Sequence, residues 1–241
     1  MGKIRLDKFL SEQKIATRSQ IKVLLKKQNV CVNEVRVTDC SFKIEPFTDK
    51  ISIDGRSISY EKNIYIMLNK PAGVVTATKD NINKTVLDLI GDDVTKKDRL
   101  SAVGRLDKDT TGLLILTDDG ELNHRLVSPK HHVSKKYKAA LDAPLDNFGD
   151  VCLEMKSGID IGDDKKTLPA CLERTEEADT YFITITEGRY HQVKRMFQVF
   201  GRKVIALERI SMGQLLLDKN LNYGEYRFLT KEETDSLKAS D

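Results

Sequence analysis

The amino-acid sequence predicts an α+β protein in two domains, with residues 1–60 forming a small helix-hairpin domain and residues 61–241 a larger domain. Apolar segments typical of strands outnumber the helical patterns and do not alternate regularly with them, which favours a mixed, mostly antiparallel sheet flanked by helices. A short polar stretch at residues 60–63 separates the two domains. The charge is also uneven: residues 1–60 carry 12 Lys and Arg against 7 Asp and Glu, whereas the remainder carries 28 against 30.

The first domain is predicted from two helical patterns followed by short strands. Residues 3–12 place Leu6, Phe9 and Leu10 at helical spacing, and Thr17 or Ser19 can cap a second helix. Short strands are expected at residues 30–32, 35–37, 42–44 and 51–53. A basic domain of this kind can bind nucleic acid, because Lys and Arg release counterions from phosphates. An ordinary solvated basic face is the alternative.

The second domain opens with an apolar strand at residues 64–68. A loop is expected to follow this strand, because Pro71 and Gly73 interrupt the strand pattern. Further strands are expected at residues 137–141, 181–186 and 203–210. Helices are expected at residues 83–90, 121–127 and 191–200, the last of them ended by Gly201.

The most informative segment is Gly104–Thr117, in which a Thr-Thr-Gly turn after Asp107 leads into an apolar strand. This pattern places a carboxylate on a loop that a sheet anchors, where catalytic groups are often found. The segment resembles the signature loop of the RNA pseudouridine synthases of the RsuA family, and the resemblance implies that Asp107 is catalytic. The N-terminal domain resembles an S4 RNA-binding domain, so the expected fold is an S4-like domain followed by a pseudouridine synthase domain.

Three other motifs extend the resemblance over nearly the whole chain. The Lys-Pro-x-Gly loop at residues 70–73 is similar to the opening motif of the family. Tyr137 matches the tyrosine expected to stack on uracil, and Lys194 matches the basic residue expected to pair with Asp107. Many family members outside this branch have Arg at the position of Lys194, so the lysine departs from the wider pattern. Arg105 matches an arginine that enters the space left by an extruded nucleotide.

The reaction implied by the resemblance breaks the bond between N1 of uracil and C1′ of ribose, rotates the base and joins C5 to C1′. It needs neither a cofactor nor a metal, and the carboxylate can act as a nucleophile or as a base at the sugar. We expect catalytic roles for Asp107, Tyr137 and Lys194. The residues expected to bind RNA are Arg5, Lys8, Arg18, Lys22, Lys26, Lys70, Arg105, Arg189, His191 and Arg195.

Composition limits the other possibilities. No apolar run reaches 18 residues, the N-terminus lacks the apolar region of a secretory signal, and four widely spaced cysteines favour reduced thiols. We therefore expect a cytoplasmic monomer without membrane association. Its expected partner is ribosomal RNA, above all 16S rRNA, either naked or within an assembling small ribosomal subunit.

Three alternatives remain at this point. A family member acting on large-subunit 23S rRNA is the nearest, and a non-catalytic RNA-binding or ribosome assembly factor would keep the same scaffold. The run from Asp107 to Thr111 also fits the D-x-D-x-T loop of phosphatases, but it lies in mid-chain without the βαβ alternation that such a loop requires. His124, His131 and His132 match no zinc-binding spacing.

Overall fold

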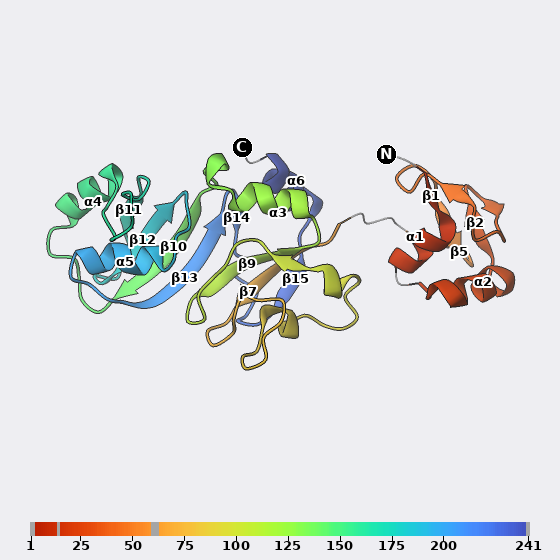
Figure 1. The fold of residues 1–241 in the computed structure, drawn as a ribbon, viewed down its shortest axis with the longest axis horizontal. Helices are drawn as coiled ribbons and strands as arrows, with labels where there is room; N and C mark the ends of the chain where they lie inside the picture. The colour runs from red at the N-terminus through yellow and green to blue at the C-terminus, as the bar shows by residue number, and fades with distance from the viewer. Residues whose placement is uncertain (1–2, 14, 59–62, 240–241) are drawn as a thin grey trace. The chain divides into compact units, whose positions relative to one another are not determined.

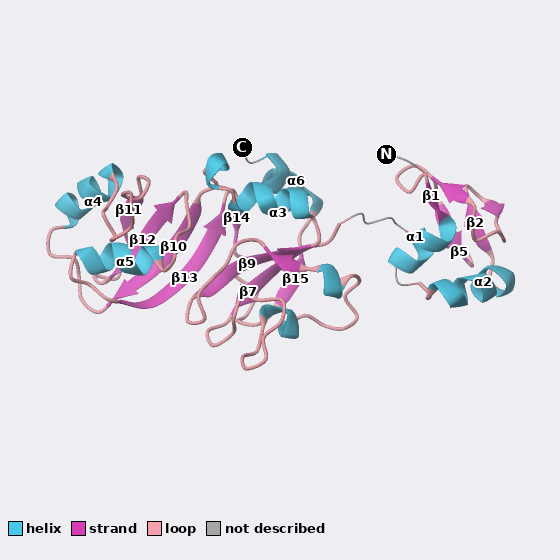
Figure 2. Cartoon of the chain, viewed as in Figure 1, coloured by secondary structure: helices cyan, strands magenta, loops and turns pink. Residues whose placement is uncertain are grey.

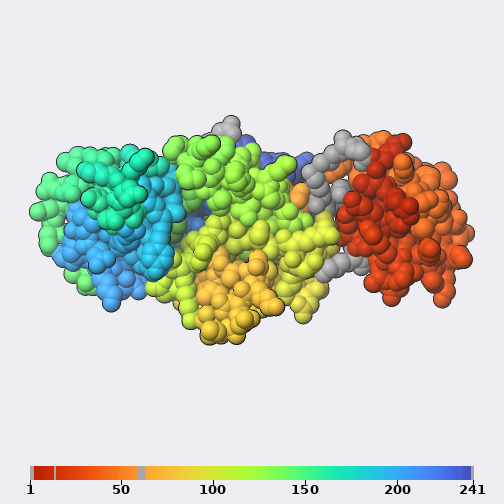
Figure 3. Space-filling view, viewed as in Figure 1, coloured from red at the N-terminus to blue at the C-terminus, as the bar shows by residue number. Residues whose placement is uncertain are grey.

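The computed structural model describes residues 3–13, 15–58 and 63–239, and divides into two compact units (Figures 1 and 3). The first unit comprises Met1–Asn63 with Asp92–Lys97, and the second comprises Ile64–Gly91 with Asp98–Asp241. The polar linker predicted at residues 60–63 lies outside the described residues except for Asn63. None of the helices in the described parts of the chain is long and apolar enough to cross a membrane.

The N-terminal unit has the predicted helix-hairpin fold (Figure 2). Helices α1 (Leu6–Glu12) and α2 (Arg18–Lys27) pack on a sheet ordered β3-β2-β5-β6. Thr17 is the N-cap of α2, and its backbone N–H donates to the side chain of Gln20 at 3.1 Å. The strands are β2 (Val30–Val32), β3 (Val35–Arg36), β5 (Ile51–Ile53) and β6 (Arg56–Ile58), with β1 (Ile4–Arg5) pairing separately with β4 (Lys43–Ile44).

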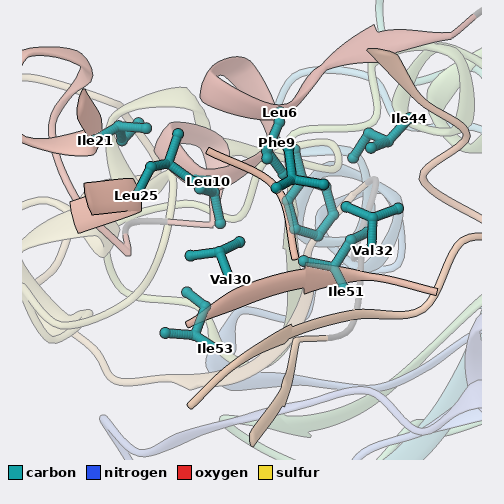
Figure 4. Close-up of a cluster of buried hydrophobic side chains, with 11 residues drawn as sticks. Leu6, Phe9, Leu10, Ile21, Leu25, Val30, Val32, Ile44, Ile51 and Ile53 are labelled. Carbon is teal, nitrogen blue, oxygen red and sulfur yellow. The ribbon is translucent and has the colours of Figure 1, made fainter. Parts of the chain in front are cut away.

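The periodic apolar residues form the core of this unit, as the close-up in Figure 4 shows. The side chains from both helices meet those of β2 and β5, and each is at most 9% exposed. Its labelled members are Leu6, Phe9, Leu10, Ile21, Leu25, Val30, Val32, Ile44, Ile51 and Ile53. Burial of this set leaves the basic residues of α2 on the solvent side.

The larger unit is built on a sheet ordered β11-β12-β10-β13-β9-β7-β15, in which every pairing is antiparallel except that of β13 with β9. Two short strands, β8 and β14, attach to β9 and β13. The bounds are β7 (Tyr65–Lys70), β8 (Ser101–Ala102), β9 (Thr111–Thr117), β10 (Lys135–Leu141), β11 (Cys171–Arg174), β12 (Thr180–Ile185), β13 (Val204–Met212), β14 (Leu215–Leu216) and β15 (Tyr226–Phe228).

Four helices cover this sheet. In α5 (Gln192–Val199) the buried Phe197 lies near Tyr181 of β12, and Phe148 of α4 (Phe148–Ser157) stacks on the same tyrosine. Helices α3 (Gly120–Val127) and α6 (Lys231–Ala239) bury Leu122 and Leu237 in a core shared with β7 and β9. The two helix pairs therefore cover different halves of the sheet (Figures 1 and 2).

The short helix expected at residues 83–90 is confirmed only over its centre, and as a 3-10 helix. The segment contains one 3-10 turn, η1 (Val86–Leu89), because Thr85 and the side chain of Asp88 cap each other and close a single turn. Two further 3-10 turns are η2 (Lys97–Arg99) and η3 (Pro129–His131).

The two halves of the sheet meet at a narrow junction. The parallel pairing of β13 with β9 extends over two residue pairs, Glu208 with Thr111 and Arg209 with Gly112. Gly112 has φ +97°, and a Cβ atom there would lie 2.9 Å from the backbone nitrogen of Arg209 and closer still to its carbonyl oxygen. The buried Arg209 side chain donates from Nε to the carbonyl of Leu113 at 2.8 Å. Glycine is therefore required at residue 112 both for its conformation and for the approach of the strands.

Candidate active site

Asp107 lies on the loop between β8 and β9, directly before the sheet junction. The N–H of Thr110 donates to the carbonyl of Asp107 at 3.1 Å, which closes a turn. The Thr76 hydroxyl donates to the carbonyl of Leu106 at 2.8 Å, tying this loop to the one that follows β7. The Asp107 side chain is 31% exposed, so the carboxylate is held by the fold yet open to a substrate.

Lys70 supports the Asp107 loop from the interior of the protein. Its side chain is completely buried, and Nζ donates to the carbonyls of Pro71, Asp107, Lys108 and Thr110 at 2.8–3.3 Å. Burial lowers the pKa of Lys70 to about 8, although the nearby carboxylates of Asp107 and Asp109 act in the opposite direction. The expectation that Lys70 contacts RNA is corrected, since a side chain without exposed surface holds the Asp107 loop instead.

Lys194 brings a cation to Asp107 from the other half of the sheet. It lies in the first turn of α5, with Nζ 3.2 Å from Asp107 Oδ2 and 2.6 Å from Asp109 Oδ1. Burial opposes the charged form of Lys194, but the hydrogen bonds to Asp109 and Asp107 raise its pKa overall. A cation is unfavourable at a helix N-terminus, and the two carboxylates offset this cost. The pairing of Lys194 with Asp107 was expected from the sequence, whereas its contact with Asp109 was not.

Asp109 is the more exposed of the two carboxylates, at 73% against 31%. The hydrogen bond from Lys194 holds the pKa of Asp109 below its usual range. Its spacing of two residues from Asp107 fits the D-x-D-x-T pattern, which does not predict a contact with Lys194.

His191 also reaches Asp107. Its Nε2 lies 3.5 Å from Asp107 Oδ1, and its backbone adopts a left-handed conformation at φ 50°, ψ 33° immediately before α5. The neighbouring Tyr190 ring stacks on the imidazole, with the centroids 3.8 Å apart and the planes inclined by 18°. Asp107 thus contacts a lysine and a histidine that come from one short segment.

Arg189 and Arg195 were expected to contact RNA, and the structure gives both of them intramolecular partners. Arg189 donates to Glu187 at 3.0 Å and to the carbonyls of Lys165 and Lys166, and Arg195 pairs with Asp163 at 2.6 Å. The hydrogen bond from Arg195 lowers the pKa of Asp163. Arg189 therefore ties the loop before β11 to the segment before α5, and Arg195 ties the same loop to α5 itself.

A buried polar network behind this segment was also missed. Glu187 is 9% exposed and accepts hydrogen bonds from the backbone N–H of Leu168 and the side chain of Gln192. The side-chain Oε1 of Gln192 in turn accepts from the backbone N–H of Arg189 at 2.9 Å. Lys135 on β10 is also buried, and burial lowers its pKa to about 8. A sequence pattern alone does not distinguish these buried polar side chains from solvated ones.

Tyr137 and Arg105 are in contrasting environments. Tyr137 is 8% exposed on β10, directly opposite Arg209 of β13, one strand away from the junction with β9. Arg105 is exposed two residues before Asp107, and no carboxylate in the described part of the chain pairs with it. Its guanidinium group is therefore available to a partner beside the Asp107 loop.

The basic residues predicted for the N-terminal unit lie on its helices or next to them. Arg18, Lys22 and Lys26 are exposed along α2. Arg5 pairs with Asp7 at 2.7 Å, and Lys8 lies 3.9 Å from Glu12. Lys22 and Lys26 have no ion pair among the described residues, whereas Arg5 and Lys8 have acidic neighbours and Arg18 interacts electrostatically with Asp7.

Comparison with known proteins agrees with this arrangement. Residues 64–199 match the family model of RNA pseudouridylate synthases, and residues 4–51 match that of the S4 domain. The chain is 44% identical to ribosomal small subunit pseudouridine synthase A of Vibrio cholerae, covering 97% of this chain and 99% of that protein. It is 40% identical to an uncharacterized RNA pseudouridine synthase of Bacillus subtilis, with coverage of 97% and 98%.

A solved structure is similar as well. A crystal structure of a pseudouridylate synthase superposes with a TM-score of 0.67 at 39% identity, covering 97% of this chain and 99% of that one. Among the residues described, no group of three or more His, Cys, Asp or Glu side chains is arranged to hold a metal ion.

Proposed function

The chain belongs to the RNA pseudouridylate synthase family and is an isomerase, and we propose that it converts one uridine of 16S ribosomal RNA to pseudouridine. The proposed target is the uridine that corresponds to position 516. The name of the relative from Vibrio cholerae, which refers to the small ribosomal subunit, supports this choice over 23S rRNA. We further propose that the chain acts as a cytoplasmic monomer, on free rRNA or within an assembling small subunit.

The observation that carries the proposal is the contact of one partly exposed carboxylate, Asp107, with Lys194 and His191. Isomerisation of uridine requires a carboxylate that can act at C1′ or C2′ of the ribose. Lys194 Nζ lies 3.2 Å from Asp107 Oδ2, so this contact holds the carboxylate in a fixed place. Lys70 fixes the backbone under Asp107, so the carboxylate is positioned before the substrate arrives.

The other roles are proposed from the motifs that Tyr137 and Arg105 match. Cleavage of the N1–C1′ bond and formation of the C5–C1′ bond leave the overall proton count unchanged, since the proton lost from C5 is balanced by the one gained at N1. Tyr137 supplies a ring for the uracil and a hydroxyl for the proton transfer. Arg105, exposed and without a carboxylate partner in the described residues, fills the space that the extruded nucleotide leaves.

Initial binding of RNA is proposed to come from the N-terminal unit. Arg18, Lys22 and Lys26 lie exposed on one helix, where they can contact phosphates. These contacts provide affinity but little sequence information, so the choice of uridine depends on the larger unit.

The test is single-turnover pseudouridine formation by Asp107→Asn on 16S rRNA and on a fragment around the proposed target. We expect no detectable product together with nearly unchanged RNA affinity, because the amide keeps the shape but cannot act as a nucleophile or a base. Asp109→Asn is the matched comparison and should lose less activity, because Lys194 keeps its contact with Asp107.

Near wild-type turnover by Asp107→Asn would contradict the assignment. Mapping of pseudouridine in rRNA from cells with and without the protein tests the target itself. Loss of a modification in 23S rRNA, with 16S rRNA unchanged, would refute the proposed substrate while leaving the activity intact.

A further inference from the structure

We propose that Tyr190 and His191 form a stacking platform for RNA, which receives the unpaired base of a nucleotide next to the target uridine. This inference rests on the proposed function and adds a residue that helps to select the substrate. Tyr190 had no role in the catalytic scheme above.

The exposure of Tyr190 is the first observation. Its side chain is 76% exposed, more than any other aromatic side chain of the described residues. One face of the ring is covered by the imidazole of His191 at a centroid distance of 3.8 Å. The other face carries no ring or cation contact within the described structure. A planar group at that face would extend the existing stack by one layer.

The platform is also rigid, which distinguishes it from a surface tyrosine on a mobile loop. The turn that carries it is closed by a hydrogen bond from the Gln192 N–H to the Arg189 carbonyl at 3.2 Å. Arg195 donates to the carbonyl of Tyr190 at 3.2 Å. Helix α5 begins at the next residue after His191. Little conformational freedom is left for a ligand to remove on binding.

The position of the pair identifies the kind of ligand. His191 lies 3.5 Å from Asp107, so the stack begins at the reacting carboxylate and ends at the exposed ring of Tyr190. A uridine that reaches Asp107 has left its helix, and its neighbours lose a stacking partner on that side. An aromatic face beside the site can replace that partner. Stacking of this kind tolerates any base, so the platform recognises an unpaired neighbouring nucleotide rather than the identity of its base.

The experiment combines enzyme variants with altered substrates. The variants are Tyr190→Ala and Tyr190→Phe, with Tyr223→Ala as a control because Tyr223 is also exposed, at 60%, and its hydroxyl contacts Glu208 rather than Asp107, Lys194 or His191. The substrates are an RNA fragment containing the target and two versions with an abasic nucleotide on its 5′ or its 3′ side. The measured quantity is kcat/KM for pseudouridine formation, with thermal unfolding as the check on folding.

Tyr190→Ala should lower kcat/KM on the intact fragment by about 5- to 150-fold, the range that corresponds to loss of one base–aromatic stack. Tyr190→Phe and Tyr223→Ala should stay close to wild type. An abasic nucleotide on one of the two sides should reduce wild-type activity by a similar factor and leave Tyr190→Ala nearly unaffected. That non-additivity is the signature of a direct contact.

Equal activity of Tyr190→Ala and wild type, or abasic effects that add to the mutation on both sides, would overturn the inference. A variant with lower thermal stability but unchanged kcat/KM would overturn it as well, because Tyr190 would then only protect His191. Failure of the wild-type enzyme to modify any rRNA fragment refutes the proposed function, a result distinct from each of these.

Discussion

Replacement of Gly112 by Ala tests whether the narrow sheet junction determines both stability and activity. An alanine would adopt φ +97°, a conformation that costs an L residue about 1–2 kcal/mol. Its Cβ would lie 2.9 Å from the Arg209 nitrogen and from Glu208 Cγ, whereas ordinary contact begins at 3.4 Å, so β9 and β13 must separate by about half an ångström or more. Overpacking of this kind costs about 1–3 kcal/mol, which gives a total of about 2–5 kcal/mol.

Gly224→Ala is the matched control, because Gly224 also has a positive φ, of +88°, but a Cβ there would meet nothing within 4 Å. Chemical denaturation should therefore show a loss of about 1–2 kcal/mol in the control, and a clearly larger loss in Gly112→Ala. Activity should fall in Gly112→Ala even where the protein is fully folded, because the displaced strand carries the Asp107 loop. A loss in Gly112→Ala no larger than that of the control would refute the steric argument.

Three further predictions concern lysines. Lys194→Met should slow single-turnover chemistry far more than RNA binding, and Lys194→Arg should recover part of the rate; a normal rate with weaker binding would make Lys194 a phosphate contact. Stability should rise with pH between about 8 and 10, because native Lys70, with a pKa of about 8, then binds fewer protons than the unfolded chain, whose lysines have pKa values near 10.4. Lys70→Met should reduce the increase of the free energy of unfolding by up to about 1.4 kcal/mol per pH unit. An equally steep increase in the variant would contradict the contribution of Lys70. The single substitutions Lys22→Gln and Lys26→Gln should each reduce the slope of log affinity against log salt by about 0.7–0.9. Lys231→Gln on α6 is the control. An unchanged slope in the α2 variants would exclude phosphate contacts by these lysines.

The sequence predicted the structure well where the spacing of apolar residues, or a motif, has a single structural explanation. The helical spacing of Leu6, Phe9 and Leu10 predicted a buried face, and the apolar run after Gly112 predicted the central strand. The carboxylate and lysine of the site were predicted as partners from two motifs, and the structure brings them to 3.2 Å.

The sequence was least informative for polar residues that the fold buries. Lys70 and Arg189 look like solvated cations in any local window, since only the folded chain brings carbonyl groups from distant loops around them. Helix α4 was not predicted, although Phe148, Val151 and Met155 do follow helical spacing. The position of Tyr190 beside Asp107 depends on a left-handed residue, His191, whose conformation its type does not dictate.

The junction between the sheet halves also determines when this protein has an active site at all. Leu113 and Arg209, which bridge the halves, are 96 residues apart in the chain. Closing a loop of that length costs about 4 kcal/mol in chain entropy, more than two residue pairs of a ladder can supply alone. Asp107 and Lys194, on opposite sides of this bridge, therefore come together only through the cooperative packing of the whole larger unit. Proteolytic or truncated pieces of that unit should have no partial activity, and the active fraction of a sample should equal its folded fraction.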